Sequence, residues 1–129
     1  MKTYTWEDVS VYKVLLVDDE ILVREAISAK IEWNKLGYEL ACVCENGKAA
    51  VEFIEKTPVD VVLTDICMPY IDGMELSRYL HENYPQTAII IFSGYSDFEY
   101  AKQAIQYKVS EYILKPVTAK ELTEVLERV

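Results

Sequence analysis

Short apolar runs alternate with longer amphipathic segments along the chain. Five runs have the length and composition of buried strands: KVLLVDD (13–19), ELACVCE (39–45), VDVVLTD (59–65), TAIIIF (87–92) and EYIL (111–114). The run at 87–92 has no polar alternation, which predicts burial on both faces of a sheet. Because helix-like segments follow the runs, the pattern predicts parallel strands joined by right-handed crossovers.

The segments that follow the strands predict five helices, at 20–33, 48–56, 74–84, 96–107 and 118–129. In the first helix the apolar residues recur at helical spacing: Leu22, Val23, Ala26, Ile27 and Ile31. The last helix has a single apolar stripe: Leu122, Val125, Leu126 and Val129. Gly37 follows the first helix as a stop signal.

Polar residues mark the points where helices begin. Asn46-Gly47 can form a hairpin turn, but the helical segment after it favours Asn46 as a cap. Thr118 caps the last helix, and Ser96 or Asp97 caps the fourth. Together the elements predict one α/β domain at residues 12–129, a doubly wound five-stranded parallel sheet of the (βα)5 type with helices on both faces. Residues 1–11 are expected to be an irregular N-terminal extension.

Five polar side chains follow the predicted strands. Asp18 and Asp19 end the first run, Asp65 ends the third, Ser93 follows the fourth and Lys115 follows the fifth. In an open parallel sheet the loops after the strands meet at one edge, and ligands bind there. Three carboxylates, a hydroxyl and a lysine at this edge favour a site for a divalent cation and a phosphoryl group.

Asp65 is the predicted nucleophile, because a carboxylate can attack phosphorus and hold the group as an aspartyl phosphate. The neighbouring Asp18 and Asp19 disfavour its charge, and a bound Mg²⁺ reverses that effect. Mg²⁺ binds through one or two carboxylates, waters and phosphate oxygens. Asp19 and Asp65 are the expected direct ligands, with Asp18 acting through water. Any one Asp alone is better explained as a helix cap or a strand-end solvent residue, so the prediction depends on the three together.

Lys115 offers a positive charge to the oxygens of a transferring phosphoryl group. Pro116 after it fixes a tight turn and makes a cis peptide bond accessible, which argues against an ordinary surface lysine. Ser93 offers a hydroxyl donor. A serine before Gly94 is more often a plain turn residue, so only its place after the fourth strand favours the functional interpretation.

Charge and composition narrow the class of protein. The net charge of −9 argues against direct binding of this segment to nucleic acid, where affinity comes mainly from Lys and Arg. No apolar run reaches the length of a membrane span and no signal peptide is evident, so the cytoplasm is the expected location. The three cysteines are expected to be buried, reduced thiols, since Cys42 and Cys44 alone do not make a metal site.

The motifs VLLVDDE, LTDICMPYIDG, FSGY and YILKP, in this order, resemble the receiver domains of two-component response regulators. The resemblance implies the CheY-like fold that flavodoxins share, with strand order 2-1-3-4-5. It further implies that Asp65 accepts phosphate from a phosphohistidine on a sensor histidine kinase, that Lys115 binds the phosphoryl group, and that the backbone carbonyl of Cys67 completes the Mg²⁺ ligands. Ser93 and Tyr112 occupy the positions of the family's switch residues.

The segments NGKAAVEFIE, SGYSDFEYAKQAI and IEWNKLGYEL further resemble the YesN-type subgroup, whose members carry an AraC-type DNA-binding domain beyond the residues of this chain. The expected output surface is the fourth helix, the fifth strand and the fifth helix, through which a phosphorylation-dependent homodimer forms. Phe98, Ala101 and Ile105 are expected in the core there. Tyr100 and Tyr107 are equally consistent with core packing and with partner contact. His81 is expected at the surface.

Three other functions share parts of this pattern. A phosphatase of the haloacid dehalogenase type usually has a second Asp two residues after its nucleophile, where this chain has Cys67. A flavodoxin-like cofactor binder needs a Ser/Thr/Gly-rich phosphate loop after the first strand, where this chain has Asp18-Asp19-Glu20. A receiver without an output domain shares all of the pocket chemistry and differs only in its output. Gly47-Lys48 lacks the partner glycine of a nucleotide-binding loop.

Overall fold

The computed structural model describes residues 11–94, 102 and 107–129. Its centre is a parallel sheet of five strands: β1 (Tyr12–Val17), β2 (Tyr38–Cys44), β3 (Val61–Asp65), β4 (Ala88–Ser93) and β5 (Glu111–Leu114). The strand order is β2-β1-β3-β4-β5, and every strand pair is parallel. The predicted fold class and strand order are therefore confirmed.

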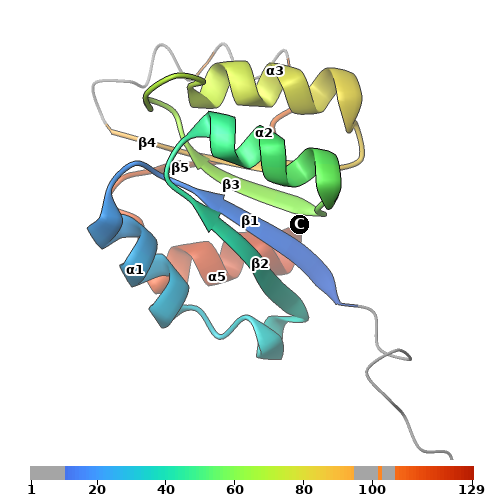
Figure 1. Ribbon diagram of the computed structural model, residues 1–129. Coiled ribbons are helices and arrows are strands. Elements are labelled where there is room, and N and C mark those ends of the chain that lie inside the picture. Colours follow the sequence, from blue (N-terminus) through green and yellow to red (C-terminus); the bar gives the residue numbers. More distant parts are fainter. Residues whose placement is uncertain (1–10, 95–101, 103–106) are drawn as a thin grey trace, which may run out of the picture.

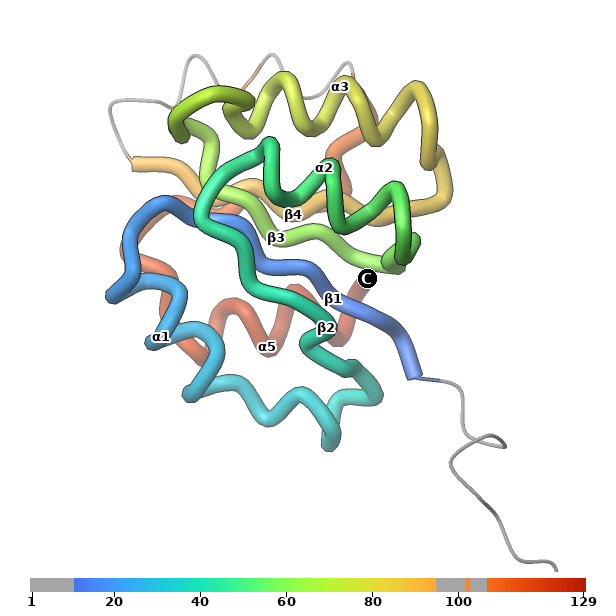
Figure 2. Tube along the Cα trace, in the orientation of Figure 1, coloured from blue at the N-terminus to red at the C-terminus, as the bar shows by residue number. Residues whose placement is uncertain are grey.

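Helices cover both faces of the sheet. Helices α1 (Ile21–Lys30) and α5 (Ala119–Arg128) lie against one face, while α2 (Gly47–Lys56) and α3 (Gly73–Asn83) lie against the other (Figure 1). The trace in Figure 2 shows the sheet between these two helix pairs. Right-handed crossovers between parallel strands place successive helices in this way.

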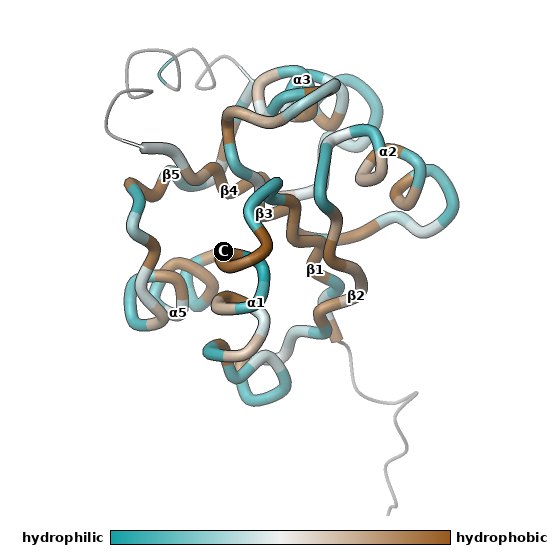
Figure 3. Tube along the Cα trace, turned by 60° about the vertical axis from the view of Figure 1, so that its left-hand side comes forward, coloured by the Kyte–Doolittle hydropathy of each residue, from teal (hydrophilic) through white to brown (hydrophobic). Residues whose placement is uncertain are grey.

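Two apolar clusters, one on each side of the sheet, form the core. On one side Ala50, Ile54, Leu76 and Leu80 from α2 and α3 pack against β1, β3 and β4. On the other side Ile27, Leu122 and Val125 from α1 and α5 pack against the same strands. Residues 89–92 of β4 are buried, as the lack of polar alternation predicts. Figure 3 shows the same division, with the strands mostly hydrophobic and the helices carrying hydrophilic stretches.

The first helix is shorter than predicted. Helix α1 ends at Lys30, and a separate 3₁₀ turn (Asn34–Leu36) precedes Gly37, whose φ of 84° ends that turn. Ile31 is buried although it lies just beyond the helix. Leu22, placed by the sequence in the apolar stripe, is 76% exposed.

The predicted caps of the described helices are present. The Asn46 side chain accepts a hydrogen bond from the Ala49 N–H at 2.8 Å, so Asn46 caps α2 and does not form a hairpin. The Thr118 hydroxyl accepts one from the Glu121 N–H at 3.1 Å and caps α5. In the α5 stripe Leu122, Val125 and Leu126 are buried, but Val129 follows the helix and is 41% exposed, contrary to the prediction.

The predicted fourth helix falls largely outside the described residues. This holds for its cap at Ser96 or Asp97 and for Phe98, Tyr100, Ala101 and Ile105. Of that helix Lys102 and Tyr107 are described, and the Tyr107 ring lies against His81 of α3 with centroids 6.2 Å apart. Among the described residues, no helix has both the length and the apolar character that a bilayer span requires.

Candidate functional site

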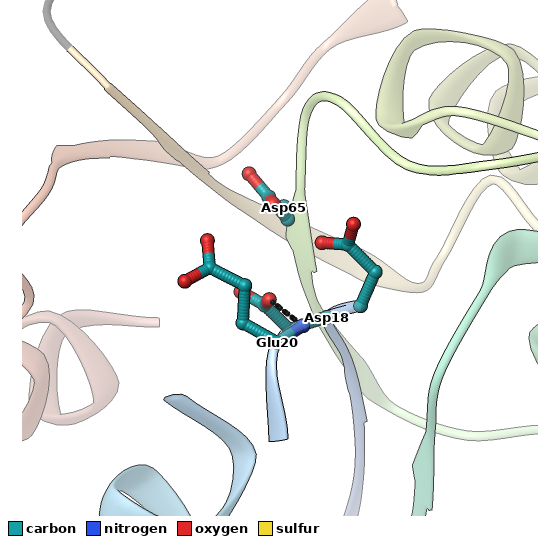
Figure 4. A group of neighbouring side chains, drawn as sticks. Asp18, Glu20 and Asp65 are labelled. Carbon is teal, nitrogen blue, oxygen red and sulfur yellow. Dashed lines mark hydrogen bonds between the residues drawn. The ribbon is translucent and has the colours of Figure 1, made fainter. Parts of the chain in front are cut away.

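Acidic side chains from β1 and β3 meet at the carboxyl edge of the sheet. Asp18 directly follows β1, and Asp65 is the last residue of β3. Pairing of Val17 with Thr64 brings these two strand ends level. Oxygen atoms of Asp18, Asp19, Glu20 and Asp65 lie within 4.8 Å of one another. Figure 4 shows the carboxylates of Asp18, Glu20 and Asp65 around a common space.

Lys115 joins this group from the end of β5. Its Nζ lies 3.2 Å from Asp65 Oδ2, 3.3 Å from Asp18 Oδ2 and 3.5 Å from Glu20 Oε1. The Lys115 N–H donates to the Ser93 carbonyl at 2.8 Å, which fixes the start of the β5–α5 loop against β4. The peptide bond between Lys115 and Pro116 is cis, as the sequence suggests. One ammonium group therefore contacts three carboxylates at once.

The loop after β1 is held from several directions. The Asp18 N–H donates to the Cys44 carbonyl at 3.1 Å, and the Asp18 carbonyl accepts from Arg24 Nη1 at 2.7 Å. Asp18 Oδ1 accepts from the Glu20 N–H at 2.9 Å, the bond drawn in Figure 4. These bonds orient the Asp18 carboxylate toward Asp65 and Lys115.

The carboxylates suit a divalent cation. Asp18 is fully buried, and its Oδ2 atom has no hydrogen-bond partner apart from the ion pair with Lys115. Leaving a buried carboxylate oxygen without a hydrogen bond is costly, and a cation removes that cost. Asp19 is exposed at the same cluster and offers further oxygen ligands. Hard oxygen donors of this kind are those that Mg²⁺ prefers.

Burial changes the protonation of the site. Burial raises the pKa of Asp65 from 3.8 to about 6, and the charge of Asp18 adds to the rise, while Lys115 and the Ile66 N–H oppose it. Burial likewise raises the pKa of Asp18. Burial by itself lowers the pKa of Lys115, but Asp65 and Asp18 raise it above its ordinary value. A bound cation favours the charged forms of both carboxylates.

Tight packing places the loop between β3 and α3. The Ile66 N–H donates both to Asp65 Oδ1, at 2.8 Å, and to the Phe92 carbonyl, at 3.0 Å. The Gly73 N–H donates to the Ile66 carbonyl at 2.8 Å. A Cβ atom on Gly73 would lie 2.3 Å from the Asp65 carbonyl oxygen, so only glycine fits there. The first turn of α3 thus fixes the main chain of Asp65.

Ser93 and Tyr112 lie together at the ends of β4 and β5. Their hydroxyl groups are hydrogen-bonded, and the Tyr112 ring is partly buried against the core cluster of α2 and α3. Asp65 pairs with Phe92 in the sheet, which places Ser93 one residue beyond the level of Asp65. The structure thus brings together Ser93 and the aromatic residue that the sequence paired with it.

The cysteines differ in exposure. Cys44 is buried and Cys42 is half-buried, with their sulfur atoms 3.8 Å apart on one face of β2. Burial and the neighbouring Cys42 raise the pKa of Cys44 to about 12, so it is a protonated thiol near neutral pH. Cys67 is exposed, contrary to the prediction that all three are buried, because it lies in the loop after β3 and not within a strand.

Residues 14–127 match the response regulator receiver domain family. The chain belongs to this family. It is 38% identical over 118 residues to the uncharacterized transcriptional regulatory protein YesN of Bacillus subtilis, covering 92% of this chain and 32% of that protein. It is 34% identical over 117 residues to the transcriptional regulatory protein HptR of Staphylococcus aureus, covering 91% of this chain and 46% of HptR. The chain thus spans less than half the length of both regulators.

Solved structures agree with this assignment. The receiver domain of AraT, a response regulator from Geobacillus stearothermophilus, superposes with a TM-score of 0.88 at 39% identity, covering 92% of each chain. A two-component transcriptional regulator AraC from Clostridium phytofermentans superposes with a TM-score of 0.84 at 37% identity, covering 91% of each chain. The acidic cluster is of the kind that holds Mg²⁺ in receiver domains.

The sequence alone does not show that two further residues, Glu20 and Arg24, make contacts in the site. Glu20 resembles an ordinary first residue of a helix, and only the fold brings its carboxylate to Lys115. Arg24 lies among the polar positions of α1, and its bond to the Asp18 carbonyl depends on the path of the loop. The motif DDE offers the single hint, since a third acid there adds to the charge near the strand end.

Proposed function

We propose that this domain, residues 12–129 with 1–11 as an extension outside it, takes a phosphoryl group from the phosphohistidine of a sensor histidine kinase onto Asp65. One observation carries the proposal: Lys115 Nζ lies 3.2 Å from Asp65 Oδ2, inside a pocket of further carboxylates at the sheet edge. This arrangement joins a nucleophile to a cation that can bind the oxygens of the group it receives.

The residues have separate tasks in this transfer. A carboxylate oxygen of Asp65 attacks phosphorus, a P–O bond forms, and the P–N bond to the kinase histidine breaks with its electron pair remaining on nitrogen. The Ile66 N–H and Lys115 hold the Asp65 carboxylate in place before the reaction. Lys115 then redirects one of its N–H groups from a carboxylate to a phosphoryl oxygen and donates a hydrogen bond to it. The fixed main chain at Gly73 keeps Asp65 from moving away.

The proposed Mg²⁺ ligands are Asp19, Asp65 and the backbone carbonyl of Cys67, with Asp18 acting through a water molecule. Asp18 Oδ2 is buried, has no hydrogen bond and faces the cluster with an ion pair to Lys115, and such a carboxylate supports a further cation at this position. When bound, Mg²⁺ neutralises charge on the phosphoryl oxygens and on the carboxylates. Asp18 and Asp65 then remain ionised at neutral pH.

The proposed switch is the pair Ser93 and Tyr112. The Ser93 hydroxyl, bonded to Tyr112 before phosphorylation, turns toward a phosphoryl oxygen. Tyr112 then loses that partner and repacks, so the phosphoryl group shifts the population between two arrangements. We propose that this change alters the face formed by the predicted fourth helix, β5 and α5, that two copies then associate through it, and that a transcriptional output domain responds.

Intact-mass analysis after incubation with Mg²⁺ and acetyl phosphate tests the transfer. We expect one phosphoryl adduct on the wild type and none on Asp65→Asn or without Mg²⁺. Phosphorylation that persists in Asp65→Asn would contradict the assignment.

Sedimentation of the phosphorylated domain tests the association, and an unchanged sedimentation coefficient at full phosphorylation would exclude a dimer through this face.

A further inference from the structure

Glu20 differs from the other carboxylates around Lys115 in its exposure. Its side chain is 63% exposed, whereas those of Asp18 and Asp65 are 0% and 8% exposed. Its Oε1 atom nevertheless lies 3.5 Å from Lys115 Nζ and belongs to the same cluster. Its N–H is fixed by Asp18 Oδ1, so the start of α1 holds the residue beside the pocket (Figure 4). Glu20 therefore occupies the solvent side of the site.

Glu20 adds one negative charge to the entrance of the site. The cluster has four carboxylates, and its contacting cation is Lys115, whereas Arg24 binds the Asp18 carbonyl and, among the described residues, forms no ion pair with the four carboxylates. Replacing Glu20 by a neutral residue lowers the negative charge of the site by one. A charge near the entrance of a site acts on an approaching anion at full strength only at low salt, because ions in solution screen it.

Glu20 also forms an ion pair with Lys115, with Oε1 3.5 Å from Nζ. An ammonium group has three N–H donors, and three carboxylates surround this one. A phosphoryl oxygen that binds Lys115 must displace one of them. Glu20 has the longest of the three contacts and the most exposed side chain, so its carboxylate returns to water most easily.

We propose that Glu20 determines which phosphodonors reach Asp65, by disfavouring donors in proportion to their negative charge. The inference rests on the proposed function of Asp65. Small dianionic donors are repelled most, and donors with fewer charges are repelled less. A protein donor that gains its affinity from contacts outside the pocket is affected least. Glu20 thereby favours transfer from a protein over phosphorylation by small metabolites.

Two small phosphodonors of different charge separate the effect of Glu20 on donor approach from any effect on the phosphoryl transfer itself. Acetyl phosphate is mainly a dianion at neutral pH, and phosphoramidate is mainly a monoanion. With acetyl phosphate the P–O bond to acetate breaks as the bond from Asp65 to phosphorus forms. With phosphoramidate the P–N bond breaks and the protonated nitrogen leaves as ammonia. Both leave the same aspartyl phosphate, so a difference between them reports on the approach of the donor.

The experiment compares wild type, Glu20→Gln and Glu127→Gln by the rate of adduct formation at saturating Mg²⁺. Glu127 is exposed near the end of α5, close to Leu126, whose carbonyl accepts from the Tyr38 hydroxyl at the start of β2. Glu127→Gln therefore removes the same single negative charge as Glu20→Gln, but at the opposite edge of the sheet, where β2 begins. At low salt we expect Glu20→Gln to react about fivefold faster with acetyl phosphate and about twofold faster with phosphoramidate. Both gains shrink at high salt, and Glu127→Gln matches the wild type.

Other results would overturn the inference. An unchanged ratio of the two donor rates in Glu20→Gln removes Glu20 as a determinant of the donor. A higher Mg²⁺ concentration for half-maximal rate in Glu20→Gln, with slower reaction for both donors, makes Glu20 a metal ligand instead. In both cases the wild type is still phosphorylated at Asp65. A wild type that gains no phosphoryl group from either donor overturns the proposed function and this inference with it.

Discussion

At the scale of single residues, the Asp65 carboxylate is buried and has a strongly raised pKa. Burial and the neighbouring Asp18 raise its pKa to about 6, despite the attraction of Lys115. Each unit of pKa difference corresponds to about 1.4 kcal/mol. Holding Asp65 in its charged form without a metal therefore destabilises the folded state by about 3 kcal/mol at neutral pH.

Asp65→Asn is therefore expected to stabilise the protein when no divalent cation is present. Because the folded pKa is above the unfolded one, the folded state binds the extra proton between about pH 4 and pH 6, and wild-type stability falls as the pH rises through that window. The gain in the free energy of unfolding should reach about 3 kcal/mol at pH 7.5 and about half of that at pH 5. Urea unfolding at the two pH values measures it.

Glu52→Gln provides the control for the loss of one negative charge, since Glu52 is an exposed carboxylate on α2. Added Mg²⁺ should stabilise the wild type more than Asp65→Asn and so narrow the gap between them. A gap of the same size at pH 5 and pH 7.5 would show that Asp65 has no raised pKa.

The residues that the sequence could identify are those that follow strands. Asp18, Asp65 and Lys115 were predictable because an apolar run marks each strand and parallel strand ends converge. Glu20 and Arg24 were not, because both reach the site through the path of one loop and the first turns of α1. The exposure of Cys67 follows from its place in a loop, which sequence pattern leaves undefined.

At the scale of elements, the contact between β3 and the first turn of α3 positions the nucleophile. We expect Gly73→Ala to displace the main chain at Asp65 and Ile66, because the added Cβ would lie 2.3 Å and 2.7 Å from their atoms. The substitution should reduce stability by about 1–3 kcal/mol, as overpacking generally does. It should also slow phosphorylation by acetyl phosphate at least tenfold, measured by intact mass over time.

Asp72→Ala is the matched variant for this helix. It removes the side chain that caps α3 through the Glu75 N–H at 2.8 Å, at a cost of about 1 kcal/mol, and adds no atom near Asp65. Its phosphorylation rate should stay near that of the wild type. If both variants slowed the reaction equally, loosening of the α3 start would be the cause, and the close contact at Gly73 would have no separate role.

Element boundaries were predictable where apolar pattern and local polar signals agree. Asn46 and Thr118 mark real helix starts because their side chains satisfy the first N–H groups. The end of α1 was placed too late. Ile31 continues the helical spacing of apolar residues and is buried, but it lies one residue beyond the end of the helix. Leu22 is apolar yet exposed. The spacing of apolar residues therefore identifies the buried face of a helix, but it does not show which residues on that face are covered.

At the scale of the whole molecule, phosphorylation has to change a surface distant from Asp65. In the proposed switch Ser93 carries that change by exchanging the Tyr112 hydroxyl for a phosphoryl oxygen. We expect Ser93→Ala to accept a phosphoryl group yet show smaller amide shifts in β5 and α5 when activated, as measured by NMR. Tyr112→Phe keeps the ring and leaves the serine able to turn, so its shifts should be closer to the wild type.

Amide shifts of equal size in Ser93→Ala and wild type would exclude Ser93 as the link. Ser93 lies at the end of β4, and β5 pairs with that strand through Ser93 and Leu114. The shifts that matter are therefore those of β5 and α5, since residues beside Asp65 respond to the added charge itself.

The architecture of the described residues was predictable because one pattern, a strand followed by a helix, recurs along the chain and permits few topologies. The order β2-β1-β3-β4-β5 follows once the family motifs are recognised, and the structure bears it out. Contacts between elements far apart in the sequence were not predictable. The hydrogen bond from the Tyr38 hydroxyl of β2 to the Leu126 carbonyl of α5, for instance, joins residues 88 positions apart and has no local signal in the sequence.

The central claim is that Asp65 itself carries the phosphoryl group. The most direct measurement is reduction of the phosphorylated protein with borohydride, which converts an aspartyl phosphate to homoserine, followed by peptide mapping. The account predicts homoserine at position 65 and at no other carboxylate. Homoserine at position 18 or 19, or a reduced glutamyl residue at position 20, with Asp65 intact, would contradict it.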